Sequence, residues 1–315
     1  MRWGSFQASR FETLQYGKTM ELIEIQRNTD AHEALESGNI LYFPLEPSGL
    51  SEADRSILLS IRQANGALHK NIAYRPLEDR ISGAEQPGSA SAKALHSALK
   101  NYSQWAIRFT GEILPRYKQY WRLDYASFRP QEEEGRDLPW KKRNDLLHVD
   151  AFPSRPTKGD LILRVFTNIN ADQKRVWLTS DPFAKLASQY APAAGLPEIA
   201  RQSDSGVEQM RRASIRAFRS IGLPLADRSP YDRFMLSFHD YLKANPEYQR
   251  DCTKYRFEFP PGSTWMVFTD VVPHAVLSGR FALEQTFIIA RSSLANPAHA
   301  PASILEALSG KPLTQ

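Results

Sequence analysis

Three residues of this chain have the types and the spacing of a metal site built from histidine and carboxylate. His148 and Asp150 stand two apart in the apolar segment 146–153. Because successive side chains of a strand point to opposite faces, a strand here would present both residues to one ion. His274 follows the apolar segment 259–272 at the start of another expected strand. Two histidines and one carboxylate can hold iron(II) on one side and leave positions open for a co-substrate and dioxygen.

Each of these residues also has an ordinary structural explanation. A His-x-Asp pair occurs by chance in many strands, and His274 could equally donate to a backbone carbonyl. His239 and Asp240 provide a comparison, because neighbouring residues on a helix point about 100° apart and cannot bind one ion together. We predict structural roles for His239 and Asp240, and we predict that the catalytic metal ligands are His148, Asp150 and His274.

Composition restricts the kinds of site that are possible. The 315 residues include one cysteine, Cys252, which excludes an internal disulfide, a thiolate zinc site and a cysteine-held iron–sulfur cluster. No window approaches the roughly 18 uninterrupted apolar residues of a membrane span, and the N-terminus lacks the apolar core of a signal peptide. We therefore expect a cytoplasmic protein, whose net charge of +5 favours an anionic partner.

A dioxygenase with such a site also needs a cation for the distal carboxylate of 2-oxoglutarate. Arg164 is the first candidate, because it lies between apolar residues and would be costly to bury without an anion. The alternative for Arg164 is an ion pair with a protein acid. Arg280, six residues beyond His274, is a second cationic candidate. Further predicted co-substrate contacts are Thr167, Asn168 and Gln285, and the alternative for Gln285 is a place in the core.

The elements that must position these residues are predicted from hydrophobic period and from Gly, Pro, Asn and Asp. Strands are predicted at 38–44, 124–129, 146–152, 160–168, 175–178, 256–259, 262–268, 275–278 and 281–290. The strands between 124 and 178 are expected to form an antiparallel meander. Helices are predicted at 31–37, 51–65, 91–121, 182–190, 206–221, 230–244 and 302–308, with a loose stretch at 81–88.

Two β-rich blocks separated by helices indicate an α+β protein with a double-stranded β-helix (jelly roll) core, flanking helices and a helical insert. We expect residues 1–37 to be an N-terminal extension with a short helix. Residues 38–309 are expected to be a single jelly-roll dioxygenase domain, with the insert at about 181–251. Residues 310–315 are expected to be a C-terminal tail.

At these residues the chain resembles the Kdo hydroxylases, 2-oxoglutarate-dependent enzymes that act on the 3-deoxy-D-manno-oct-2-ulosonic acid (Kdo) of lipopolysaccharide. The resemblance covers roughly residues 38–309. It rests on the segments Leu147–Pro156, Leu163–Asn170, Arg175–Trp177, Pro260–Trp265, His274–Gly279 and Leu283–Phe287. Arg280 departs from the pattern, because a neutral residue is more usual there. Residues 1–19 lie outside the resemblance, and we expect them to be an upstream mis-start.

The resemblance implies Fe(II), 2-oxoglutarate and O2 as cofactor and co-substrates. It implies hydroxylation of carbon 3 of Kdo in the lipopolysaccharide inner core to give D-glycero-D-talo-oct-2-ulosonic acid (Ko), with succinate and CO2 as co-products. A substrate such as Kdo-lipid A would place the protein peripherally at the inner face of the cytoplasmic membrane. Predicted substrate-binding residues are Arg129, Arg143 and Arg155, with Lys141 and Lys142 as further candidates.

Other functions remain open from the residues alone. The same chemistry could act on another acidic metabolite or a lipid. Nucleic acid is not expected, because the chain has no stripe of alternating aromatic and basic residues. A non-catalytic jelly-roll sugar-binding module would use His148 and Asp150 only for hydrogen bonds. A zinc hydrolase with the same three ligands would consume neither 2-oxoglutarate nor oxygen, so metal content and co-substrate consumption separate these functions.

Overall fold

In the computed structural model, the described residues are 22–24, 30–45, 48–61, 71–83, 89–203, 210, 214, 215, 217 and 226–315. Their strands form two sheets. The larger sheet has the order β1 (Leu22–Glu24), β2 (Ile40–Phe43), β9 (Thr264–Phe268), β6 (Leu161–Asn168), β11 (Ala282–Ile289), β5 (Trp121–Arg129), β3 (Ile72–Arg75) and β4 (Arg80–Ser82). The smaller sheet has the order β10 (His274–Ser278), β7 (Arg175–Thr179) and β8 (Tyr255–Phe259). Strands β1 and β2 are parallel, and the other pairs are antiparallel.

The two facing sheets confirm the jelly roll predicted from the sequence, but the predicted meander is wrong. Strands β5 and β6 are separated by β11, and β7 lies in the other sheet. A jelly roll alternates between its sheets, so strands that follow one another in the chain need not pair. Short strands with similar apolar patterns do not specify their partners, and closure of the two sheets over one core decides the pairing. Strands β1, β3 and β4 were also not predicted, and two of the three residues of β4 lie in the stretch expected to be loose.

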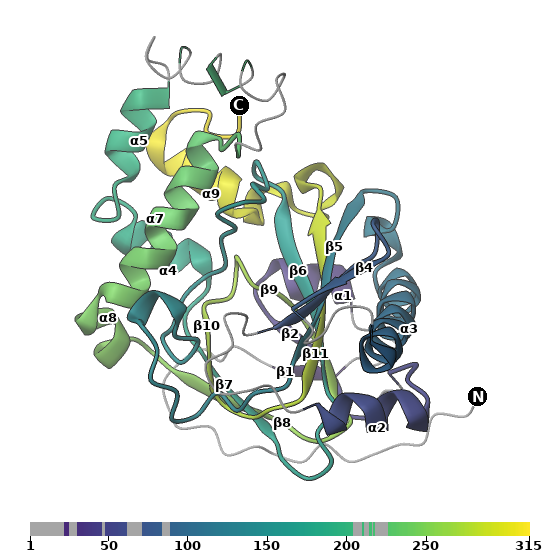
Figure 1. Ribbon diagram of the computed structural model, residues 1–315. Helices are drawn as coiled ribbons and strands as arrows, with labels where there is room; N and C mark the ends of the chain where they lie inside the picture. The colour runs from purple at the N-terminus through teal and green to yellow at the C-terminus, as the bar shows by residue number, and fades with distance from the viewer. Residues whose placement is uncertain are drawn as a thin grey trace.

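Helices cover both sides of the sheets (Figure 1). On one side are α1 (Ala31–Glu36), α2 (Glu52–Ser60) and α3 (Ala90–Ile113), and on the other are α4 (Phe183–Tyr190), α5 (Leu196–Ser203), α7 (Pro230–Ala244), α8 (Pro246–Asp251) and α9 (Pro301–Ser309). Helix α3 stops short of the predicted end at Trp121, because Pro115 follows its last turn and cannot continue the helix. Most of the predicted helix at 206–221, and residues 62–65 of the helix predicted after Ser51, lie outside the described residues.

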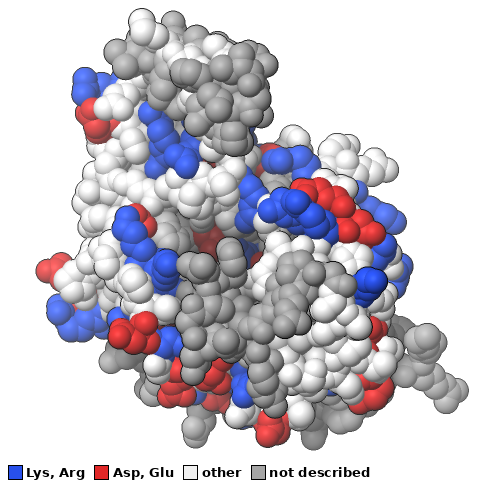
Figure 2. Space-filling model, viewed as in Figure 1, with Lys and Arg blue, Asp and Glu red and all other residues white. Residues whose placement is uncertain are grey.

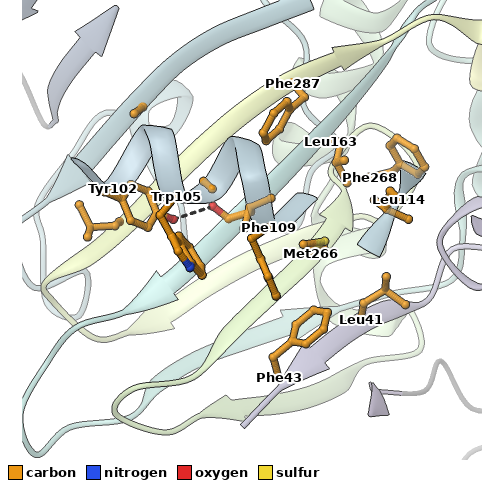
Figure 3. Packing of buried hydrophobic residues seen from close by; sticks show 14 of the residues in the cluster. Leu41, Phe43, Tyr102, Trp105, Phe109, Leu114, Leu163, Met266, Phe268 and Phe287 are labelled. Carbon is orange, nitrogen blue, oxygen red and sulfur yellow. Dashed lines mark hydrogen bonds between the residues drawn. The ribbon is translucent and has the colours of Figure 1, made fainter. Parts of the chain in front are cut away.

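The larger sheet buries both of its faces. On the outer face, Trp105 and Phe109 of α3 stack with ring centroids 5.0 Å apart and belong to the same buried cluster as Met266 of the sheet (Figure 3). On the inner face, Phe259 of the smaller sheet stacks on Trp265 of the larger one at 3.9 Å. The contact between the sheets therefore closes the jelly roll at this end, and polar side chains occupy the space beyond it.

The helices on the other side form a separate apolar cluster that includes the end of the chain. Leu313 is fully buried in this cluster, and its carbonyl accepts a hydrogen bond of 2.8 Å from the backbone of Tyr231 at the start of α7. The backbone of Leu313 also donates to Glu306 of α9. Leu313, in the segment expected to be a tail, is thus packed against the start of α7.

Gly279 joins β10 to β11 in a conformation that only glycine adopts readily, with φ at +110°. A Cβ atom there would lie 2.8 Å from the Cα of Arg175, whereas at Gly195, with φ at +99°, nothing lies within 4 Å. Both Gly279→Ala and Gly195→Ala should cost about 1–2 kcal/mol for the positive φ, and Gly279→Ala should cost about 1–3 kcal/mol more through overpacking. Urea unfolding measures this difference, and equal losses in the two variants would contradict the packing described.

Candidate active site

The segment around His148 alternates between a buried core and a cavity. Leu147 and Val149 pack into the helical cluster, whereas His148 and Asp150 face the cavity. The backbone of His148 exchanges hydrogen bonds with His274, and the backbone of Asp150 donates to Thr269 at 2.9 Å. The predicted strand at 146–152 is therefore reduced to a single bridge to His274, because only alternate residues bond to a neighbour. The side-chain alternation that the prediction relied on is still present.

His148, Asp150 and His274 converge on one point. One ligand-type atom from each lies within 4.8 Å of the others, and this is the one such group found in the described part of the chain. The Nδ1 atoms of the two histidines lie 2.7 and 3.0 Å from the carbonyls of Leu146 and Val272. Donation from Nδ1 leaves Nε2 of each ring unprotonated, which is the form that binds a metal. The geometry and donor types fit an ion such as iron(II).

The electrostatics of the three residues favour metal binding at neutral pH. Burial, together with neighbouring His274 and His239, lowers the pKa of His148 well below its usual range. Burial also lowers the pKa of His274, although Asp150 opposes the shift. For Asp150, burial alone would raise the pKa, but Arg164 and the two histidines lower it below its usual range. The histidines are therefore neutral and the carboxylate ionised, as ligands must be.

A cavity of about 410 Å³ opens beside these residues, between the two sheets and α7. Figure 2 shows a hollow on this face of the molecule, with basic side chains gathered around it. Within the described residues, Asp150 is the one carboxylate that lines it, and the basic lining residues are Arg129, Lys141, Lys142, Arg164, Arg175 and Lys243. This excess of positive charge suits ligands that carry carboxylates or phosphates.

A chain of ion pairs connects the proposed metal ligand to the cavity arginines. Arg164 contacts Asp150 and Glu284, each at 2.9 Å, and Arg129 contacts the other oxygen of Glu284. Burial alone would raise the pKa of Glu284, but the two arginines lower it. Two roles were considered for Arg164, a cation for the co-substrate and an ion pair with a protein acid. Arg164 lines the cavity and also pairs with protein acids, so its position is compatible with both roles.

Arg175 lines the cavity, although no binding role was predicted for it. It is 1% exposed, and its Nη1 donates to the carbonyl of Gly279 at 2.9 Å. Its Nη2 lies 3.8 Å from Glu133, and neither Nη2 nor Nε makes a hydrogen bond to the described residues. Burial lowers the pKa of Arg175 to about 10, so the side chain is still charged at neutral pH. A buried cation with unused donors is a ready partner for an anionic ligand.

Three predicted co-substrate residues lie away from the cavity, because their side chains are occupied elsewhere. Thr167 faces the outer cluster and shares hydrogen bonds with Thr264 and Tyr102. Asn168 shares a strand face with Arg164, but its amide donates to the carbonyls of Gln173 and Phe259 at the end of the strand. Gln285 is fully buried and bonds to Ser103 and to backbone, in agreement with the core alternative.

Three predicted arginines are also absent from the cavity lining. Arg280 lies over the ring of Phe281, 4.0 Å from its centroid. Arg143 pairs with Asp145 two residues away, and Arg155 pairs with Asp124 at 2.9 Å while stacking on two aromatic rings. Of the predicted substrate cations, Arg129, Lys141 and Lys142 do line the cavity. The sequence around each of these basic residues gives no signal that separates the two groups.

Helix α7 adds two lining residues that sequence reasoning missed. His239, to which we assigned a structural role, lies with its ring centroid 4.8 Å from that of His148. Lys243 follows one turn later. The exclusion of His239 and Asp240 as a chelating pair agrees with the structure, because Asp240 instead pairs with Lys141 at 2.7 Å. His239 and Lys243 are four residues apart on a predicted helix and therefore share one face, and this spacing could have indicated from the sequence that they lie together.

Comparisons with known proteins agree with this geometry. The sequence model of the family described as 3-deoxy-D-manno-oct-2-ulosonic acid (Kdo) hydroxylase matches residues 19–312. The chain belongs to the Kdo hydroxylase family. The resemblance seen in the sequence is thereby confirmed. A search among curated proteins found no match.

Solved structures of the Kdo hydroxylase KdoO, a non-haem Fe(II) alpha-ketoglutarate-dependent dioxygenase, are similar over nearly the whole chain. The complex with alpha-ketoglutarate and Fe(III) is 34% identical, with a TM-score of 0.77 and coverage of 92% of this chain and 93% of that one. The cobalt(II) complex is also 34% identical, with a TM-score of 0.78 and coverage of 93% and 94%. Among the described helices of this chain, none is both long and apolar enough to cross a membrane.

Loss of either histidine should abolish tight metal binding. Because only three side chains converge as donors in the described residues, loss of one leaves two, and His148→Ala or His274→Ala should weaken cobalt(II) binding by about 100-fold or more. His96→Ala, at a surface residue beside Asp79, is the matched control and should bind normally. Isothermal titration calorimetry measures the affinities, and undiminished binding in His148→Ala would contradict this ligand set.

The low pKa values of the two histidines predict how metal binding depends on pH. Since protons compete for Nε2 only below the pKa in the folded protein, cobalt(II) affinity should stay nearly constant down to about pH 6.5, the ordinary histidine value. The affinity should fall at lower pH. Titrations across this range test the prediction, and a decline centred at or above about pH 6.5 would contradict it.

Proposed function

We propose that this member of the Kdo hydroxylase family hydroxylates carbon 3 of Kdo, with His148, Asp150 and His274 holding Fe(II). The observation that carries the proposal is the convergence of these three side chains beside a cavity lined by six basic residues. The reaction consumes one O2 and one 2-oxoglutarate for each sugar. One oxygen atom enters the sugar as a hydroxyl group that gives Ko, the other enters succinate, and CO2 leaves.

The residues present fit the metal and co-substrate of KdoO. Two neutral imidazoles and one carboxylate suit Fe(II), and they leave coordination positions for 2-oxoglutarate and O2. When bound, iron supplies the oxidising chemistry that the side chains of this chain lack. The protein holds the ligands in place, because the backbone carbonyls of Leu146 and Val272 fix the two rings and Arg164 fixes the carboxylate.

The cavity arginines are suited to the carboxylates of 2-oxoglutarate. Arg164 was the first candidate, and its two terminal nitrogens are already engaged by Asp150 and Glu284. Arg175 has buried donors without hydrogen-bond partners among the described residues, and Arg129 lies close enough to Arg175 to lower its pKa. We assign Arg175 and Arg129 to the distal carboxylate, with Arg164 between them and the metal.

The physiological substrate in this proposal is Kdo attached to lipid A. The acidic sugar and the phosphates of such a lipid match the positive charge of the cavity and its surroundings. A lipid-linked substrate would bring the protein to the inner face of the cytoplasmic membrane as a peripheral protein. Residues 38–309 would act as one catalytic domain, in which the insert at about 181–251 borders the substrate side of the cavity.

The direct test is reconstitution with Fe(II) and 2-oxoglutarate without oxygen, followed by admission of O2 with and without Kdo-lipid A. We expect succinate together with the mass gain of one oxygen atom on the sugar, and neither product from His148→Ala. Succinate without the mass gain would support the dioxygenase activity and contradict the assignment of Kdo as the substrate. Metal binding without consumption of 2-oxoglutarate would favour a hydrolase, and failure to bind metal would favour a sugar-binding module.

Replacing Arg175 should affect the co-substrate more than the metal. Because charge-assisted hydrogen bonds are worth about 1.5–3 kcal/mol, Arg175→Met should raise the KM for 2-oxoglutarate by roughly 10- to 100-fold. Arg280→Met, outside the cavity lining, is the matched control and should leave this KM unchanged. Steady-state succinate formation measures both, and an unchanged KM in Arg175→Met would remove Arg175 from the co-substrate site.

A further inference from the structure

Trp140 is an exposed aromatic residue next to the wall of the cavity. It is 41% exposed, whereas Trp177 and Trp265 are almost fully buried, as is usual for much of a tryptophan side chain. Trp140 begins a short 3-10 helix, and the two residues that follow it, Lys141 and Lys142, line the cavity. This helix therefore runs from the surface into the cavity wall, and Trp140 lies at the rim.

The position of Trp140 is fixed through its neighbour Lys141. The Nζ of Lys141 lies 5.1 Å from the centroid of the Trp140 ring and donates to Asp240 of α7 at 2.7 Å. The carbonyl of Lys141 accepts a hydrogen bond of 3.0 Å from Lys243, which is buried in the same helix. An aromatic ring held in this way loses less conformational entropy when a ligand packs against it.

The cavity is too small for the whole of a lipid-linked substrate. Its volume of about 410 Å³ is near the lower end of the range of small-molecule sites, which is about 300–1,000 Å³. A space of this size suits 2-oxoglutarate and one sugar. The saccharide that is attached to the hydroxylated sugar therefore has to lie outside the cavity, against its rim.

We propose that Trp140 packs against the sugar that is linked to the hydroxylated Kdo, and thereby forms a second saccharide site at the rim of the cavity. This inference rests on the proposed hydroxylation of lipid-linked Kdo. The C–H groups on one face of a sugar ring are apolar and weakly positive, so they pack well on the negative face of an indole. Lys141 and Lys142 lie beside this ring and suit acidic groups on the same part of the substrate.

Three substrates of increasing size test this site. They are the methyl glycoside of Kdo, the water-soluble phosphorylated saccharide that remains when the acyl chains of Kdo-lipid A are removed, and Kdo-lipid A itself. For each one, kcat/KM for hydroxylation is measured with Fe(II), 2-oxoglutarate and O2. The original protein should prefer the saccharide to the methyl glycoside by roughly 5- to 10-fold, because only the saccharide reaches Trp140.

Trp140→Ala should remove this preference. It should lower kcat/KM for the saccharide and for Kdo-lipid A by roughly 5- to 10-fold and leave kcat/KM for the methyl glycoside within about twofold. Trp140→Phe retains an aromatic face and should keep most of the preference. Tyr120→Ala is the matched control, because Tyr120 is 54% exposed and precedes β5 at the end opposite to the cavity residue Arg129. This control should behave as the original protein.

The outcomes separate this inference from the proposed function. Unchanged turnover of the saccharide in Trp140→Ala, or equal losses with the saccharide and the methyl glycoside, would overturn the inference. A loss confined to Kdo-lipid A would also overturn it, and would indicate that Trp140 contacts a lipid surface instead of a sugar. If the original protein hydroxylates none of the three substrates, the assignment of Kdo as substrate is wrong, and the inference is overturned with it.

Discussion

The ionic contact between Arg164 and Asp150 is the interaction on which the rest of the site depends. Asp150 is buried next to two histidines, and burial alone would favour its protonated form. Arg164 keeps it ionised, and Glu284 balances the charge of Arg164 on the side away from the proposed metal. Because Arg129 shares Glu284, one buried carboxylate positions two of the cavity cations. Replacing any one of these charged residues with a neutral one would leave an uncompensated buried charge, which would destabilise the folded protein.

The fold divides the site between two structural layers. The sheets supply His274 and the arginines from strands whose pairing fixes their positions, as in the register between Arg164 and Thr286. The helical cluster supplies the opposite wall, because Leu147 and Val149 anchor the segment that carries His148 and Asp150. Helix α7 belongs to this wall, and Leu313 packs at its start.

Local patterns predicted the parts of the molecule that depend on local geometry. The two-residue spacing of His148 and Asp150 places them on one side of an extended segment even though the expected strand is only a bridge. Most strand and helix positions followed from hydrophobic period, and α7 has the predicted bounds. Strand pairing, and which side chains line the cavity, depend on contacts between residues that are distant in the sequence. Arg175 begins an expected strand and Arg280 stands between two expected strands, but closure of the sheets turns Arg175 inward and leaves Arg280 against Phe281.

In the proposed reaction, the site formed by the three ligands and the basic cavity inserts one oxygen atom of O2 into Kdo. Turnover of a Kdo glycolipid with isotopically heavy O2 in ordinary water, followed by mass spectrometry of the sugar and of succinate, tests it most directly. The heavy isotope is expected in the new hydroxyl group and in succinate, and both signals should be lost in His148→Ala. A hydroxylated sugar whose new oxygen comes only from water, or one that forms without 2-oxoglutarate, would contradict it.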